Sequence, residues 1–226
     1  MGYTAGDFLP HKESLKTHMS LKDSPHKEEL RAAGWSTRGY LPHFDGRAIP
    51  QFITLHLEDA LPVKVVERWI RQLANLSDKE KAILLQRRID RYLDQGYGEC
   101  HLRDPAVASM VQKALLDGDG VSYGLFSWVV MPNHTHSLST RFEGLELKET
   151  MRLHKSYTAH EANRLLGREG EFWMDDYFDR YIRNGKHFQN VVRYIENNPV
   201  KAGYCKRPED WPFSSAWFRS RGIKPK

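Results

Sequence analysis

Cysteine and long apolar runs are both scarce in this chain. Its two cysteines, Cys100 and Cys205, match no zinc-binding spacing, so the sequence suggests neither a disulfide scaffold nor a structural zinc site. No apolar stretch approaches the roughly 20 residues that a membrane span requires, and residues 1–30 are polar without a signal-peptide core. We therefore expect no membrane partner and a location in the reducing cytoplasm.

The charge balance is moderately basic. Lysine and arginine total 34 against 29 aspartate and glutamate, which gives a net charge of +5 and a pI near 9.1. Such a balance favours a polyanionic partner, although it equally serves solubility. Residues 1–37 are polar and lack apolar periodicity, which predicts a loosely ordered N-terminal extension.

Apolar periodicity predicts strands mixed with helices after this extension. The alternation of Ile53, Leu55 and Leu57 predicts a half-buried strand. The run 125–130 is typical of a central strand covered on both faces, and Pro132 predicts a bend between two strands within 131–138. Helices are predicted over 62–75, 77–95, 105–116, 145–166 and 187–198, the last ended by Pro199, and an aromatic tail over 211–218 is expected to pack on the body.

Two histidines, His134 and His136, stand two residues apart in an extended segment. Alternate residues of a strand point to the same face, so both imidazoles can converge on one cation. Neutral imidazole is a good ligand for several divalent metals. The spacing fits equally a pair of histidines that only form hydrogen bonds at a strand edge.

A tyrosine and an asparagine share one flank of the predicted helix 187–198. Phe188, Val191 and Ile195 belong to its buried stripe, while Tyr194 lies beside the stripe with Asn198 four residues later. Both polar groups can therefore reach a site on the sheet. The alternative is a boundary tyrosine followed by the helix-stop dipeptide Asn198-Pro199.

Basic and aromatic side chains are interleaved in two segments. Single-stranded nucleic acid is held by such mixtures, because cations follow the phosphates and rings stack on bases. Aromatic rings at these spacings also suit a protein core. The cations predicted to contact DNA are Arg152, Lys155, Arg180, Arg183 and Lys201.

Taken in order, these motifs resemble those of the single-tyrosine HUH transposases, and most closely the REP-associated tyrosine transposases, which handle repetitive extragenic palindromes. The resemblance rests on W-V-V-M-P-N-H-T-H-S-L (128–138), F-W-M-D-D-Y-F-D-R-Y-I-R-N (172–184), Y-I-E-N-N-P-V-K-A-G (194–203) and W-P-F-S-S (211–215), with R-G-Y-L-P-H-F-D (38–45) as in longer members. It covers residues 38–218, which are expected to form the catalytic domain, followed by a basic tail over 219–226.

The resemblance implies an α+β fold with an antiparallel sheet of about four or five strands and helices on one or both faces, similar to the ferredoxin-like or RRM-like HUH palm. It also implies His134 and His136 as metal ligands, Asn198 as a third ligand and Tyr194 as nucleophile. Thr135 and Ser137 stand where the family usually has apolar residues, and we expect altered packing on the face opposite the imidazoles.

The implied activity is that of a bacterial, nucleoid-associated transposase. With Mg²⁺ or Mn²⁺ it would cut single-stranded DNA beside a REP-like hairpin through a 5′-phosphotyrosine, and the oligomeric state could be monomer or homodimer. Two alternatives stay open: a hairpin-binding protein that keeps the fold but does not cut, and a metal hydrolase that uses activated water.

Overall fold

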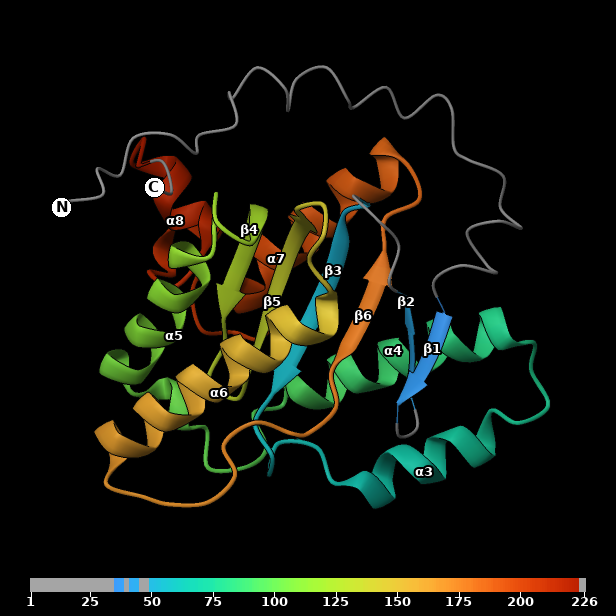
Figure 1. The fold of residues 1–226 in the computed structure, drawn as a ribbon. Helices are drawn as coiled ribbons and strands as arrows, with labels where there is room; N and C mark the ends of the chain where they lie inside the picture. Colours follow the sequence, from blue (N-terminus) through green and yellow to red (C-terminus); the bar gives the residue numbers. More distant parts are fainter. Residues whose placement is uncertain (1–34, 39–40, 45–48, 224–226) are drawn as a thin grey trace, which may run out of the picture.

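The computed structural model describes residues 35–38, 41–44 and 49–223, and its centre is a four-stranded antiparallel sheet (Figure 1). The strands lie in the order β4-β5-β3-β6. Their bounds are Gln51–His56 for β3, Tyr123–Val130 for β4, His134–Arg141 for β5 and Phe178–Tyr181 for β6. The expected α+β class with an antiparallel sheet and flanking helices is therefore confirmed.

A second sheet precedes this one. It pairs β1 (Trp35–Arg38) with β2 (Leu41–Phe44), and β2 lies beside β6. Strand β1 begins at Trp35, so it overlaps the last three residues of the segment 1–37 that was predicted to be loosely ordered. Residues 1–34 of that segment lie outside the described residues.

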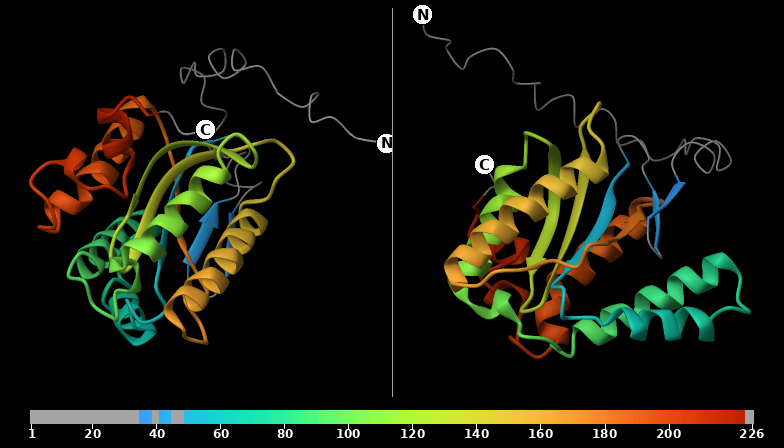
Figure 2. Two further views of the ribbon diagram at one scale, coloured as in Figure 1. Left: turned by 90° about the vertical axis from the view of Figure 1, so that its left-hand side faces the viewer. Right: turned by 60° about the horizontal axis from the view of Figure 1, so that its bottom comes forward.

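Helices cover both faces of the main sheet (Figure 2). One face carries α5 (Pro105–Asp117) and α6 (Leu147–Leu166), and the other carries α7 (Gly185–Lys201). Two helices that follow β3, α3 (Val63–Gln72) and α4 (Asp78–Leu93), pack against each other at one end of the sheet. In the described part of the chain, no helix is both long and apolar enough to cross a bilayer.

Local sequence signals set several helix ends as predicted. Pro62 directly precedes α3. Ser77 and Glu80 form a reciprocal capping box at the start of α4, which satisfies backbone N–H groups that have no partner within the helix. Gly167 ends α6 in the left-handed conformation, with φ of 62°, a region that glycine enters without steric cost.

Strand β4 lies at the edge of the sheet, so its predicted central position was wrong. The C-terminal segment explains why an edge strand is so apolar. Val130 N–H donates to the Phe213 carbonyl at 2.8 Å, and Trp211 Nε1–H donates to the Val130 carbonyl at 2.9 Å. Because this segment covers the outer edge of β4, its side chains from residues 127–130 are buried as if the strand were central.

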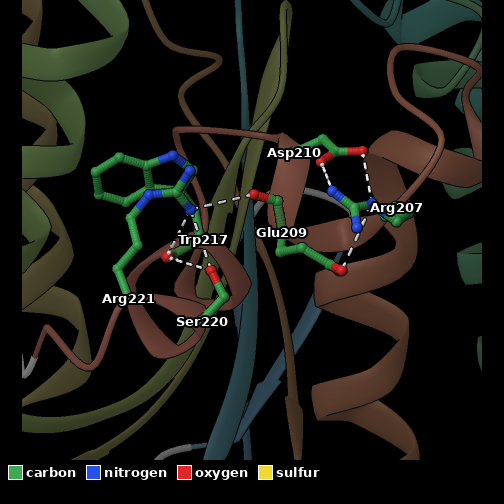
Figure 3. Close-up of polar contacts among 6 residues, drawn as sticks. All are labelled: Arg207, Glu209, Asp210, Trp217, Ser220 and Arg221. Atoms are coloured by element: carbon green, nitrogen blue, oxygen red, sulfur yellow. Dashed lines mark hydrogen bonds and ion pairs between the residues drawn. The ribbon is translucent and has the colours of Figure 1, made fainter.

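The same C-terminal segment forms ion pairs within itself and with α7. Arg207 pairs with Asp210 in the short helix η2 (Pro208–Asp210), and the Arg221 guanidinium lies 4.1 Å from the centre of the Trp217 ring (Figure 3). Helix α8 (Ser215–Ser220) begins after this bend and extends into the segment predicted as a basic tail. The expected packing of the aromatic tail on the body is therefore confirmed.

Helix α7 continues past Pro199 to Lys201, so its predicted end at Pro199 was wrong. Proline costs a helix one backbone hydrogen bond, but this proline stands in the last turn, where the remaining bonds hold. Ala202 N–H donates to the Asn198 carbonyl at 2.9 Å, and Tyr204 N–H donates to the Pro199 carbonyl at 2.8 Å. Gly203, with φ of 80°, then turns the chain away.

Candidate active site

Two neighbouring strands carry the histidines of the candidate site. His134 and His136 lie on β5, and both side chains are fully buried with ring centroids 4.7 Å apart. In the register of β3 with β5, His56 is opposite His134 and Thr54 is opposite His136. The period-2 geometry of a strand therefore brings the two imidazoles together, as the spacing predicts.

His134 is oriented by the residue before it. The Asn133 amide donates to the carbonyls of Leu93 and Tyr97, at 3.2 and 3.0 Å, at the end of α4. Its carbonyl oxygen is thereby directed to His134 Nδ1, 2.7 Å away, and can only accept a hydrogen bond from Nδ1–H there. Nε2 of His134 is therefore the nitrogen with a free lone pair, and it is buried without a hydrogen-bond partner.

His136 is held between β3 and α7. Its Nδ1 shares a 2.9 Å hydrogen bond with the Thr54 hydroxyl, and its ring lies 5.1 Å from that of Phe52. Its Nε2 faces the Tyr194 hydroxyl at 3.5 Å. The two histidines thus present their Nε2 atoms from rings that are fixed at Nδ1, which is how metal-binding histidines are usually oriented.

Helix α7 brings Tyr194 and Asn198 to the same place. The Tyr194 ring lies 5.3 Å from the His136 ring and meets Phe52 edge-on at 5.8 Å. Asn198 is fully buried, and neither its oxygen nor its nitrogen has a partner of good hydrogen-bond geometry. Burying a carboxamide without hydrogen-bond partners costs free energy, and a bound ligand would offset this cost. Asn198 lies beside His134, so both side chains could bind the same ligand.

Burial sets the protonation of these groups. It lowers the pKa of His134 to about 3, with the nearby His56 as a further cause, and it lowers that of His136 well below the usual value. Burial also raises the pKa of Tyr194, with the carboxylates of Asp90 and Asp94 adding to the shift. The imidazoles are therefore neutral and the phenol is protonated near pH 7.

The donor set fits a divalent metal ion. No three His, Cys, Asp or Glu side chains within the described ranges are arranged to hold a metal. The candidate set combines two imidazoles with one carboxamide oxygen, and two of its members, His134 and Asn198, carry buried atoms without partners. Neutral imidazole and amide oxygen are suitable ligands for divalent ions such as Mn²⁺.

The five cations predicted to contact DNA fall on two sides of the sheet. Arg152 and Lys155 lie on α6, on the face opposite the histidines, where Arg152 pairs with Glu149 at 2.6 Å. The other three lie on the same side as Tyr194. Lys201 pairs with Asp94 at 2.5 Å and its ammonium lies 5.6 Å from the centre of the Tyr194 ring.

The remaining two cations, Arg180 and Arg183, belong to a basic cluster that we define as Arg87, Arg180 and Arg183. Burial lowers the pKa of Arg180, and the neighbouring charge of Arg183 lowers it further, with a smaller effect from Arg87. The negative charge of Asp90 opposes this shift, so the cluster lies close to the carboxylates beside Tyr194. This side of the sheet therefore offers cations next to the candidate nucleophile.

Four residues around the site were not predicted from the sequence: Thr54, His56, Asn133 and Asp90. The strand containing Thr54 and His56 was predicted, but its register with the histidine strand was not. His56 is buried, its Nε2 has no partner, and burial lowers its pKa to about 4. The only local signal for Asn133 is its place beside His134, and nothing in the sequence indicated Asp90.

Thr135 and Ser137 lie on the opposite face of β5, as predicted. Both are buried, opposite Leu55 and Ile53 of β3 respectively. Small polar side chains thus face apolar residues of β3 on this side of the sheet.

Removing the Asn133 side chain should loosen His134. Asn133→Ala is expected to weaken Mn²⁺ binding by about 10- to 100-fold, the usual effect of losing a group that orients a metal-binding histidine. It should also lower the free energy of unfolding by about 1–3 kcal/mol, because the Leu93 and Tyr97 carbonyls lose a buried donor. Mn²⁺ titration and urea denaturation measure the two effects. Unchanged Mn²⁺ affinity would show that this hydrogen bond does not set the ring.

Comparison with known proteins identifies a family that part of this chain resembles. The family described as "Transposase IS200 like" matches residues 118–198, which run from the turn after α5 through β4, β5, α6 and β6 to Asn198 in α7. All four residues of the candidate site lie inside the match. The chain is therefore similar to the IS200-like transposases over the segment that contains the candidate site.

The curated relatives narrow the class. A REP-associated tyrosine transposase of Escherichia coli (strain K12) is 34% identical over 102 residues, which are 44% of this chain and 58% of the relative. A putative REP-associated tyrosine transposase of Haemophilus influenzae is 32% identical over 96 residues, covering 38% of this chain and 54% of the relative. The chain thus spans just over half the length of these relatives, and the predicted resemblance to REP-associated tyrosine transposases is confirmed.

A solved structure with a related description was also found. It is described as a REP-associated tyrosine transposase bound to a REP hairpin, and it covers 84% of this chain and 89% of its own, at 22% identity and a TM-score of 0.48.

Proposed function

We propose that this chain is a metal-dependent single-strand DNA endonuclease and strand transferase that acts beside palindromic hairpins and passes through a 5′-phosphotyrosine. The observation that carries the proposal is the position of the Tyr194 hydroxyl, 3.5 Å from His136 Nε2 and next to two buried groups without partners, His134 Nε2 and the Asn198 carboxamide. The candidate nucleophile therefore lies next to buried polar atoms that have no hydrogen-bond partner and could bind a metal ion. The similarity to REP-associated tyrosine transposases supports hairpin DNA as the substrate class.

His134, His136 and Asn198 would hold Mg²⁺ or Mn²⁺, which supplies charge neutralisation at the non-bridging oxygens of the scissile phosphate. The protein's own part is positional. Thr54 and Asn133 fix the two rings at Nδ1, and α7 holds the phenol oxygen at the site. Tyr194 attacks the phosphorus in line, so the tyrosyl oxygen–phosphorus bond forms as the bond to the 3′ oxygen breaks.

The basic cluster would guide the single strand to this site. Cations follow phosphates and supply the salt-dependent part of nucleic-acid affinity. Arg180 and Arg183 lie on the Tyr194 side of the sheet, so we propose them as phosphate contacts in preference to Arg152 and Lys155. Such a substrate would place the activity at the bacterial nucleoid.

The proposal is tested by trapping the covalent intermediate. Labelled single-stranded DNA containing an inverted repeat from the region flanking the gene is incubated with the protein in Mn²⁺ or Mg²⁺, then denatured and resolved by electrophoresis. A labelled band of protein size that requires the metal is expected. Mass spectrometry of its peptides should locate the nucleotide on Tyr194.

Two other outcomes would overturn the proposal. DNA that is bound but never cut would favour the hairpin-binding protein that has lost cleavage. DNA that is cut with no covalent band would favour a metal hydrolase that uses water.

Charge removal on the two sides of the sheet should separate the DNA contacts. Arg183→Ala is expected to weaken hairpin binding at all sequences and to reduce the slope of log affinity against log salt by about one, because one phosphate contact is lost. Arg152→Ala removes the same charge from the opposite face and should change that slope less. Fluorescence anisotropy over a salt series measures both. An equal loss in Arg152→Ala would mean that the hairpin also contacts α6.

A further inference from the structure

A carboxylate of α4, Asp90, interacts with the candidate nucleophile. Helix α4 reaches Tyr194 through Lys201, which pairs with Asp94 at 2.5 Å and lies 5.6 Å from the centre of the Tyr194 ring. Asp90, one turn before Asp94, interacts with the Tyr194 hydroxyl, and each group affects the pKa of the other. Gln86 Nε2–H donates to Asp90 Oδ1 at 2.8 Å, which fixes the rotation of the carboxylate. The phenol oxygen thus interacts both with His136 on β5, at 3.5 Å, and with Asp90 on α4.

The other charged groups near Asp90 are Asp94, Lys201 and Arg180. On α4, one turn further along, Asp94 is engaged by Lys201 of α7 at 2.5 Å, and Lys201 also lies 5.6 Å from the centre of the Tyr194 ring. From β6, Arg180 interacts with Asp90 over a longer range. Asp94 is therefore occupied by a cation, whereas Asp90 is the carboxylate turned to the phenol.

A tyrosine nucleophile needs a nearby group that accepts its proton. A phenol with an ordinary pKa near 10 is a weak nucleophile until its proton is removed, and a carboxylate within hydrogen-bonding reach can take that proton during attack. His134 and His136 do not serve this purpose if their Nε2 lone pairs are used for the metal. Asp90 is a carboxylate that interacts with the phenol and lies outside the ligand set, whereas the other nearby carboxylate, Asp94, pairs with Lys201.

We propose that Asp90 is the general base of the reaction, a role that rests on the proposed strand transfer. As the Tyr194 oxygen attacks phosphorus, its proton passes to the Asp90 carboxylate, the bond from phosphorus to the 3′ oxygen breaks, and the 3′ oxygen takes a proton from water. In the reverse step a 3′-OH attacks the phosphotyrosine and gives up its proton to hydroxide, while the protonated Asp90 returns its proton to the departing phenolate. No redox partner or further co-reactant is required.

The test is the single-turnover rate of adduct formation with the labelled hairpin DNA in Mn²⁺. Asp90→Asn keeps the shape of the side chain but cannot accept the proton, and it is expected to slow adduct formation by about 10²- to 10³-fold. Asp90→Glu should recover part of the rate. Glu67→Gln, an equal change of charge at an exposed position on α3, should leave the rate unchanged.

The pH profile distinguishes a base from a structural contact. Burial, with a smaller contribution from Asp94, raises the pKa of Asp90 to about 6. A base works only when deprotonated, so the wild-type rate should rise as the pH passes through about 6, and this limb should be absent in Asp90→Asn. The Asp90→Asn variant should have a hairpin affinity, an Mn²⁺ affinity and a midpoint of thermal unfolding close to those of the wild type.

The outcomes separate the two proposals. A wild-type adduct together with an Asp90→Asn rate within a few-fold of the wild type overturns the role of Asp90 and leaves strand transfer intact. A slow Asp90→Asn that keeps the wild-type pH profile assigns Asp90 to structure and also overturns the role. Absence of any adduct with the wild type overturns strand transfer, and the role of Asp90 with it.

Discussion

Tyr194→Phe is expected to form no covalent adduct with hairpin DNA. The rate of adduct formation should fall by about 10⁴-fold or more, the usual effect of removing a catalytic nucleophile. The change deletes one oxygen atom, the one that lies 3.5 Å from His136 Nε2. The ring keeps its packing against Phe52, so the fold and the affinity for the hairpin should be retained. Denaturing electrophoresis and fluorescence anisotropy measure these two properties separately.

Tyr157→Phe is the matched control for this variant. Tyr157 is an exposed tyrosine on α6, on the opposite face of the sheet, and its loss of the same oxygen should leave adduct formation unchanged. If Tyr194→Phe cuts the DNA as fast as the wild type, Tyr194 has no part in the chemistry and metal-activated water becomes the nucleophile.

Removal of either histidine of the proposed ligand set should have the second largest effect on adduct formation. His134→Ala and His136→Ala are each expected to weaken Mn²⁺ binding by about 100-fold or more, at least as much as losing a group that only orients a ligand. Each should also prevent detectable adduct formation. Titration of Mn²⁺ followed by electron paramagnetic resonance measures the affinity without any need for turnover or DNA.

The control for these variants is another buried histidine. His154 of α6 is buried on the opposite face, and burial lowers its pKa to about 4. His154→Ala should cost stability through the cavity that it leaves, yet keep the Mn²⁺ affinity. Mn²⁺ binding that survives in both His134→Ala and His136→Ala would place the metal elsewhere or remove it from the proposal.

The parts of the site that could be predicted from the sequence depend on short-range geometry. Two histidines on alternate residues of a strand share a face, and Tyr194 and Asn198, four residues apart, share a helix flank. Resemblance to a family joined the two pairs, because nothing in the periodicity alone says that α7 packs on β5. The structure brings all four together.

The parts that were missed depend on long-range pairing. Thr54 and His56 reach the site through the register of β3 with β5, which apolar alternation does not specify. Asp90 reaches it because α4 approaches α7 near Tyr194, where Asp94 pairs with Lys201, and a carboxylate on an amphipathic helix normally indicates only a solvated face. Strand β6 has four residues, too few for a period-2 pattern to be distinct.

The edge position of β4 could not be predicted for a different reason. Apolar content reports burial and does not report which element provides it. Here the covering element is the C-terminal segment, whose contacts with β4 come from Trp211, Phe213 and Ser214. An edge strand with such a cover has the same composition as a central one.

This C-terminal segment also decides how much of the chain a minimal catalytic fragment must keep. The family match stops at residue 198, yet Ser215 and Arg219 both bind Glu196, on the helix that carries Tyr194. A fragment cut at residue 210 would release that helix on its outer side. It would also expose the backbone of β4, and an open strand edge invites pairing with other molecules and aggregation. A well-behaved fragment therefore has to extend at least through Ser220.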